Sequence, residues 1–215
     1  MPASAPLPGL DRLIATCQQR VLPLKLSPPR DSAPKQGELV FGEPFDPQLA
    51  ATYQRLGAAE FGPLTLYGMG PEREGLVPRN EWLRSHDSAQ FRSSHVFGWE
   101  TGFAYYYGTV PRLADAHGLQ PVIYIDDYEA KYAVPVASSV DQFFDLYSHY
   151  LELMAADPEY LHTGITRINF PWSMAQTVAR DESLMRQVLA GRFDFLTNNE
   201  PDAQEWIQQL RTEHP

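Results

Sequence analysis

The feature of this sequence that most constrains its fold is a change of hydrophobic period between His95 and Leu153. Residues 95–100 and 102–110 have the pattern of two strands, joined near Glu100 to Gly102, and the second is rich in tyrosine. After residue 139 the apolar side chains recur at helical spacing instead. Because one stretch specifies both a sheet and a helix, we expect a mixed α and β fold.

A hairpin with an acidic tip is predicted inside this stretch. Residues 121–126 are apolar enough for a central strand, and residues 131–139 return as its partner. Pro135 cannot donate an amide hydrogen, so it favours an edge strand or a strand end. Acidic residues fall between the two strands, and we expect this tip to face solvent.

The helix that follows has a clear start signal. Ser139 and Gln142 have the spacing of a capping box, in which each residue satisfies a free amide of the first turn. The apolar residues of one helical face come directly after it: Phe143, Phe144, Tyr147, Leu151 and Met154.

Shorter patterns predict elements elsewhere. Asp46 is a candidate N-cap with Pro47 at the first helical position, and Gly57 is placed to end that helix. The other expected elements are an amphipathic helix near residues 10–21, a strand at 64–69, a helix at 78–86, and two C-terminal helices at 173–191 and 201–210. A proline-rich stretch at 22–37 resembles an extended arm that wraps the domain.

These elements predict one α+β domain with a mixed, largely antiparallel sheet of about 4–6 strands flanked by helices. Residues 1–36 would supply an N-terminal helix and arm, and residues 37–156 the core. Residues 157–215 would form a C-terminal helical extension packed on that core.

The net charge of −10 is unevenly distributed. Residues 111–160 carry nine acidic and two basic side chains, a net charge of −7. Such a surface repels a phosphate backbone, which argues against a nucleic-acid partner. A basic protein would be attracted and its association accelerated, although an ordinary acidic and soluble protein has the same composition.

Cysteine content and the N-terminal sequence bear on the cellular compartment. The single cysteine, Cys17, excludes an intramolecular disulfide and a thiolate-rich metal site. The N-terminus lacks the basic flank and continuous apolar segment of a signal peptide, and no apolar run is long enough to cross a membrane. We therefore expect a cytoplasmic protein.

Motifs for catalysis or metal binding are absent from the sequence. None of the six histidines has the spacing of a helical zinc pair, and the chain contains no GxSxG elbow and no phosphate-binding loop. Asp126, Asp127 and Glu129 lack the regular spacing of a calcium loop, so a solvated tip is the favoured interpretation. We expect no catalytic residue, metal or cofactor, although two of the 27 acidic residues could still meet in the fold and act as acid and base.

Tyrosines near the acidic tip are candidates for contact with a partner. Most aromatic residues of 97–107 have the parity of core side chains, but a surface tyrosine offers apolar area with a polar end. Tyr106 and Tyr124 are such candidates, as are two tyrosines of the tip itself. The predicted protein-binding residues are Tyr106, Asp126, Asp127, Tyr128, Glu129 and Tyr132.

Two segments of the chain resemble the SUKH superfamily, which contains fungal cell-wall-synthesis regulators and many bacterial toxin-immunity proteins. AAEFGPLTLYG at 58–68 is similar to the family's glycine-containing loop that leads into a short strand. PVASSVDQFFDLYSHYL at 135–151 is similar to its late strand, serine turn and Phe/Leu-rich helix. The resemblance covers about residues 37–155, and residues 157–215 extend beyond the typical domain.

This resemblance implies function by binding rather than by turnover. The bacterial branch suggests an immunity-type protein that neutralises a cognate toxin, often a basic nuclease, in the cytoplasm. The fungal branch suggests instead a regulatory or scaffold module for cell-envelope synthesis, recruited through the arm and the C-terminal helices. A small enzyme or ligand binder is the third hypothesis, and it requires a deep pocket with convergent polar groups.

Overall fold

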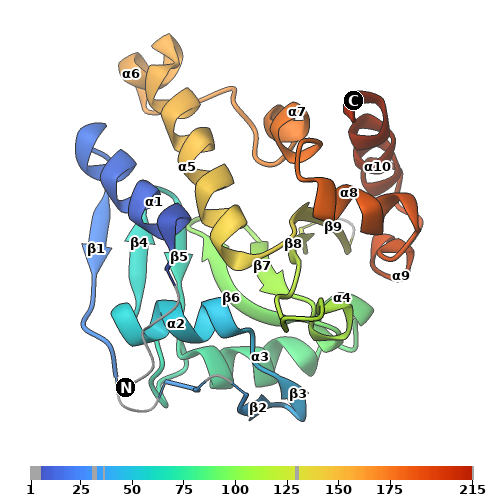
Figure 1. Ribbon diagram of the computed structural model, residues 1–215. Coiled ribbons are helices and arrows are strands. Elements are labelled where there is room, and N and C mark those ends of the chain that lie inside the picture. Colours follow the sequence, from blue (N-terminus) through green and yellow to red (C-terminus); the bar gives the residue numbers. More distant parts are fainter. Residues whose placement is uncertain (1–5, 31–32, 36, 129–130, 215) are drawn as a thin grey trace.

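The computed structural model describes residues 6–30, 33–35, 37–128 and 131–214, and shows an α+β domain (Figure 1). Its central feature is a seven-stranded antiparallel sheet of order β1-β4-β5-β6-β7-β8-β9, and β2 and β3 form a separate pair. The strands are β1 (Leu24–Leu26), β2 (Leu39–Val40), β3 (Glu43–Pro44), β4 (Ala59–Phe61), β5 (Leu64–Leu66), β6 (His95–Glu100), β7 (Tyr105–Thr109), β8 (Val122–Asp126) and β9 (Tyr132–Ala137).

Ten α-helices lie within the described part of the chain, together with short 3-10 turns at Pro111–Leu113 and Trp172–Met174. They are α1 (Pro8–Gln19), α2 (Pro47–Arg55), α3 (Leu76–Arg84), α4 (Ala89–Arg92), α5 (Val140–Ala156), α6 (Pro158–Thr163), α7 (Ala175–Val178), α8 (Glu182–Leu189), α9 (Asp194–Thr197) and α10 (Pro201–Glu213).

The predicted central strands are confirmed, but the sheet is larger than the sequence predicts. The β6–β7 and β8–β9 hairpins occupy the expected residues, and Pro135 lies in β9 at the edge of the sheet. The additional strands are β1 and β4. Residues 24–26 of the proline-rich arm pair with β4, so the arm begins as the opposite edge of the sheet.

Both faces of the sheet are covered by helices. Successive residues of β7 point to opposite faces. The ring of Tyr107 packs against Phe143 of α5, whereas the ring of Tyr106 packs edge-on against Phe91 of α4. Helices α5 and α4 therefore lie on opposite sides of the central strands.

Helix α5 begins where the sequence predicts. The Ser139 hydroxyl accepts a hydrogen bond from the Gln142 amide, which satisfies one of the free donors of the first turn. Phe143 and Tyr147 are fully buried on the helix face toward the sheet. Asp46 likewise caps α2, because its Oδ1 accepts from the amides of Gln48 and Leu49.

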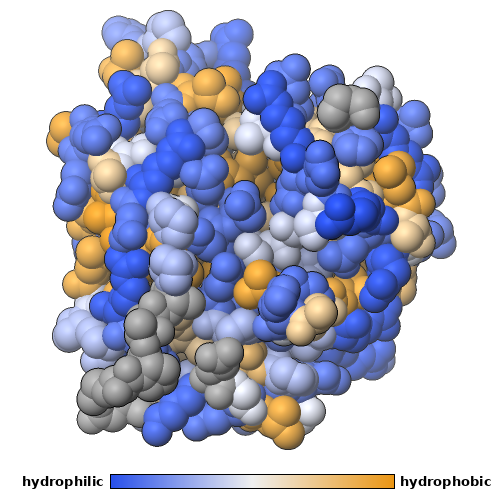
Figure 2. All heavy atoms as spheres, viewed as in Figure 1, coloured by the Kyte–Doolittle hydropathy of each residue, from blue (hydrophilic) through white to orange (hydrophobic). Residues whose placement is uncertain are grey.

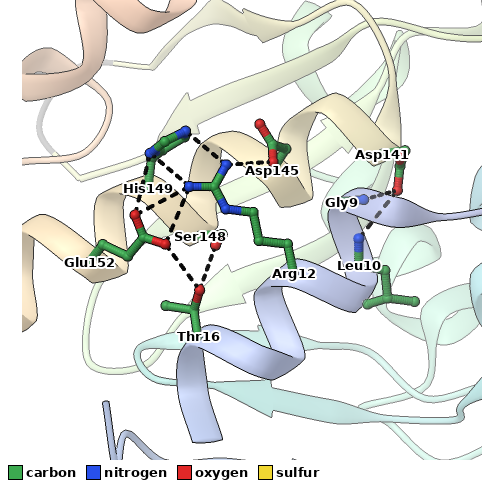
Figure 3. A network of polar contacts seen from close by, with 9 residues as sticks. All are labelled: Gly9, Leu10, Arg12, Thr16, Asp141, Asp145, Ser148, His149 and Glu152. Carbon is green, nitrogen blue, oxygen red and sulfur yellow. Dashed lines mark hydrogen bonds and ion pairs between the residues drawn. The ribbon is translucent and has the colours of Figure 1, made fainter. Parts of the chain in front are cut away.

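Helix α1 lies beside α5 and is attached to it by a polar network (Figure 3). Arg12 forms ion pairs with Asp145 at 2.9 Å and with Glu152 at 3.2 Å. Asp141 Oδ1 accepts from the Gly9 and Leu10 amides, so α5 supplies the N-terminal cap of α1. The N-terminal helix is thus an integral part of the packed structure.

The C-terminal helices cover the β9 edge. Trp206 of α10 is fully buried, and its indole Nε1 donates to the Pro135 carbonyl at 2.9 Å. The prediction of a single helix at 173–191 is wrong, because this segment forms two helices, α7 and α8. The first segment ends at Val178, and Asp181 caps the second, because its Oδ1 accepts from the Leu184 amide.

Candidate functional site

The tip of the β8–β9 hairpin is the site that the sequence predicts. Asp126 Oδ1 accepts a hydrogen bond from the Tyr128 amide, which turns the chain at the end of β8. This turn leaves the Tyr128 side chain 73% exposed. Asp127 is half-buried and forms an ion pair with Lys131 at 2.9 Å. Glu129 lies outside the described residues.

The expectation that other tyrosines are exposed is wrong. Tyr106 is 7% exposed and Tyr132 is 3% exposed, while Tyr124 is almost fully buried. Tyr106 is covered by Phe91 and by Arg79, whose guanidinium lies 5.9 Å from its ring centre. Strand parity separates core from solvent only when one face of a sheet is open, and here both faces are covered.

The C-terminal helices add an acidic residue to this tip. Burial raises the pKa of Asp126 despite its hydrogen bonds from the Tyr128 amide and the Tyr132 hydroxyl, and repulsion from Asp202 and Asp127 raises it further. Asp202 is exposed in the first turn of α10, about seventy residues from the tip along the chain. The sequence gives no signal that these carboxylates meet.

Other acidic residues of the 111–160 stretch have structural partners. Figure 3 shows Asp145 and Glu152 turned toward Arg12, and Asp141 at the N-terminus of α1. These three carboxylates therefore stabilise the contact between two helices. Fewer negative charges are therefore available to a partner than the net charge of residues 111–160 suggests. Part of this available charge lies at the hairpin tip.

A second candidate region lies beside the turn between β6 and β7, which adjoins the hairpin tip because Tyr105 of β7 pairs with Asp126 of β8. A cavity of about 480 Å³ is bounded by the β6–β7 hairpin, α5, α6 and the segment up to Phe170. Glu100 lines it and is only 8% exposed. Its aromatic walls are Phe103, Tyr105, Tyr150, Tyr160 and Phe170. The volume falls within the range of about 300–1,000 Å³ that is usual for small-molecule sites.

The sequence did not identify Glu100 as a functional residue. Its burial depends on α5, because Glu100 Oε1 accepts from the hydroxyls of Tyr107 at 2.6 Å and Tyr147 at 3.3 Å. Tyr147 comes from a helix 47 residues further along the chain. Burial raises the pKa of Glu100 above its usual value, although both tyrosine hydroxyls oppose this shift.

No known protein-family model matches the chain, and no curated protein is recognisably similar to it in sequence. Within the described ranges, no three His, Cys, Asp or Glu side chains are grouped so that they could hold a metal ion. A membrane-spanning helix is likewise not found in this part of the chain, since none of its helices is both long and apolar enough.

Proposed function

We propose that this chain is a non-catalytic protein-binding domain of the SUKH type, and that it binds and neutralises a basic toxin as an immunity protein. The sequence resemblance of residues 58–68 and 135–151 suggests this class. An α+β fold with a strand, serine turn and capped helix at 132–156 is compatible with it.

The observation that carries the proposal is the group of carboxylates at the hairpin tip, where Tyr128 is exposed. Burial raises the pKa of Asp126, and repulsion from Asp202 of α10 and from Asp127 raises it further, so Asp126 is repelled by both in the free protein. Lys131 pairs with one of them. A basic partner would relieve this repulsion, and the exposed Tyr128 ring would supply apolar contact area next to Asp126.

The proposal is tested by capture and by rescue. The tagged chain is used as bait in lysates of the strain that encodes it and of close competitors, and is co-expressed with each captured toxin candidate. We expect a basic toxin to be recovered and its toxicity suppressed. Recovery of no toxin together with failure to rescue intoxicated cells would overturn the proposal.

A double variant tests the role of the tip. Asp127→Asn with Asp202→Asn removes two charges there, and we expect association with the captured toxin to slow about ten-fold at low salt. Glu81→Gln with Glu213→Gln removes two exposed charges elsewhere and should leave the rate unchanged. Equal rates for the two double variants would show that binding uses another surface.

The alternative of a cell-envelope regulator or scaffold remains a prediction. Under this alternative, partner proteins are recruited through residues 1–36. Deleting these residues is a poor test, because it would also remove α1 from α5 and β1 from the sheet edge. Competition with a synthetic peptide of the arm leaves the domain intact and is the better experiment.

A further inference from the structure

The cavity beside the β6–β7 hairpin has a different chemistry from the hairpin tip and does not depend on the proposed function. Its lining residues come from five separate parts of the chain, and they include the turn between β4 and β5 as well as Pro23 next to β1. Among the lining residues that the structure describes, Glu100 alone carries a charged side chain. The remaining lining is mostly aromatic and aliphatic.

The carboxylate of Glu100 is only half satisfied by the protein. Both tyrosine hydroxyls donate to Oε1, and within the described residues no hydrogen bond reaches Oε2. Oε2 is not fully shielded from solvent, so it remains accessible. Glu100 lines the cavity, and we assign this accessible oxygen to the cavity wall. A buried carboxylate with an open acceptor is stabilised by a donor that carries positive charge.

The aromatic walls favour the same kind of ligand. Phe170 packs edge-on against Tyr150 at 5.4 Å between ring centres, and the ring of Tyr105 is stacked on that of Phe103 at 5.3 Å. The faces of such rings are electron-rich and attract cations. An anion would be repelled by Glu100, and a neutral ligand would leave its Oε2 without a charged partner.

The mouth of the cavity suggests an apolar chain next to that cation. Phe103 is 58% exposed, and Ile165 at the rim is also exposed. Leu161 of α6 adds to the exposed apolar surface of this region. Figure 2 shows hydrophobic surface at the end of the molecule where Figure 1 places α6. An alkyl chain that leaves the cavity would contact this surface.

We infer that this cavity binds an alkylammonium group, with Glu100 as its counter-ion and the rings of Tyr105, Tyr150 and Phe170 as its walls. A free primary amine and a lysine side chain of a protein present the same chemistry. Binding would also favour ionised Glu100, so uptake in acid solution should be accompanied by proton release.

The inference is tested by calorimetric titration of the full chain with n-pentylammonium chloride and with n-pentanol, its neutral counterpart. We expect saturable binding of the ammonium at least about ten-fold tighter than that of the alcohol. Glu100→Gln should weaken the ammonium at least about ten-fold. Glu81→Gln removes an exposed acid of α3 that does not line the cavity and should leave its affinity unchanged. Equal affinities for the alcohol and the ammonium, or no saturable binding, would overturn the inference.

A second variant keeps the inference testable if Glu100→Gln does not fold. Phe103→Leu changes an exposed ring, so it should fold normally and weaken the ammonium about three-fold. Wild-type affinity in a folded Glu100→Gln variant would contradict the inference. A further titration with Nα-acetyl-lysine methylamide identifies the source, because tighter binding than pentylammonium supports a protein lysine and weaker binding a free amine. Failure of all these titrations would leave the proposed function at the tip unaffected.

Discussion

The hairpin tip and the cavity both present carboxylates, but they differ in their access to water. At the tip Tyr128 is exposed and Asp127 is partly exposed, so charge there acts over a distance and is screened by salt. Glu100 lies in the interior, where an unpaired charge is costly and only a matching partner satisfies it. The same functional group can therefore guide the approach of a partner at one place and select a ligand at the other.

The two regions also differ in how the fold supports them. The tip is held by the C-terminal helices. Asn198 donates to the Lys131 carbonyl at 3.2 Å, and Trp206 of α10 donates to the Pro135 carbonyl of β9. The cavity is bordered by Phe170, whose ring packs against Tyr147 of the main core at 5.1 Å between ring centres. Substitutions in either support should consequently affect that region more than the other, and the two regions meet where Tyr105 of β7 pairs with Asp126 of β8 and the Asp127 amide donates to the Ala104 carbonyl.

The largest effect is expected at the cavity wall. Phe170→Ala removes a ring that contacts Tyr107, Phe143, Tyr147 and Tyr150. We expect the free energy of unfolding to fall by about 3–5 kcal/mol, because lost burial and a new void add together. Urea denaturation measures this change. Phe103→Ala at the exposed rim is the control and should cost less than about 1 kcal/mol.

A smaller effect is expected where α10 meets the sheet edge. Trp206→Phe removes the hydrogen bond to Pro135 and part of the buried ring, so the free energy of unfolding should fall by about 2–3 kcal/mol. Hydrogen exchange should accelerate in β9 and α10 more than in α5. Equal acceleration in all three would contradict the separation of the two regions.

Local patterns were sufficient to predict the central elements of this fold. The β6–β7 and β8–β9 hairpins and the cap at Ser139 are confirmed, because alternation, turn residues and capping are encoded over a few residues. Strands β1 and β4 were missed. Each has three residues, too few to show a period, and the edge strand β1 depends on β4 for its pairing.

The candidate sites show the limit of the same reasoning. Tyr128 is exposed as expected, since a turn residue has few neighbours. The burial of Tyr106 and Tyr132 depends on helices far away in sequence, as does the approach of Asp202. Glu100 was missed for the same reason, because its tyrosine donors and the cavity exist only after α5 packs on the sheet.

The raised pKa of Glu100 predicts a pH dependence that the tip should not share. Burial raises the pKa in the folded protein, so the contribution of Glu100 to stability is fully present below its usual pKa and is lost as the pH rises through the raised value. Glu100→Gln should therefore flatten the decline in stability across this range. Urea denaturation from about pH 4 to about pH 8 tests this expectation.

A remaining slope is expected in that variant. Burial also raises the pKa of Asp46 to about 6, and this group is present in both proteins. The difference between the two stability curves therefore isolates Glu100. Parallel curves would show that Glu100 titrates alike in the folded and unfolded chains.

The smallest effect on stability is expected at Tyr128. The side chain is 73% exposed, so Tyr128→Ala should change the free energy of unfolding by no more than about 0.5 kcal/mol. If the tip binds a toxin, the same change should accelerate dissociation of that complex, because an exposed tyrosine contributes mainly through contacts made on binding. Urea denaturation and dissociation kinetics together check this. A large loss of stability would mean that Tyr128 supports the fold, and an unchanged dissociation rate would place the interface elsewhere.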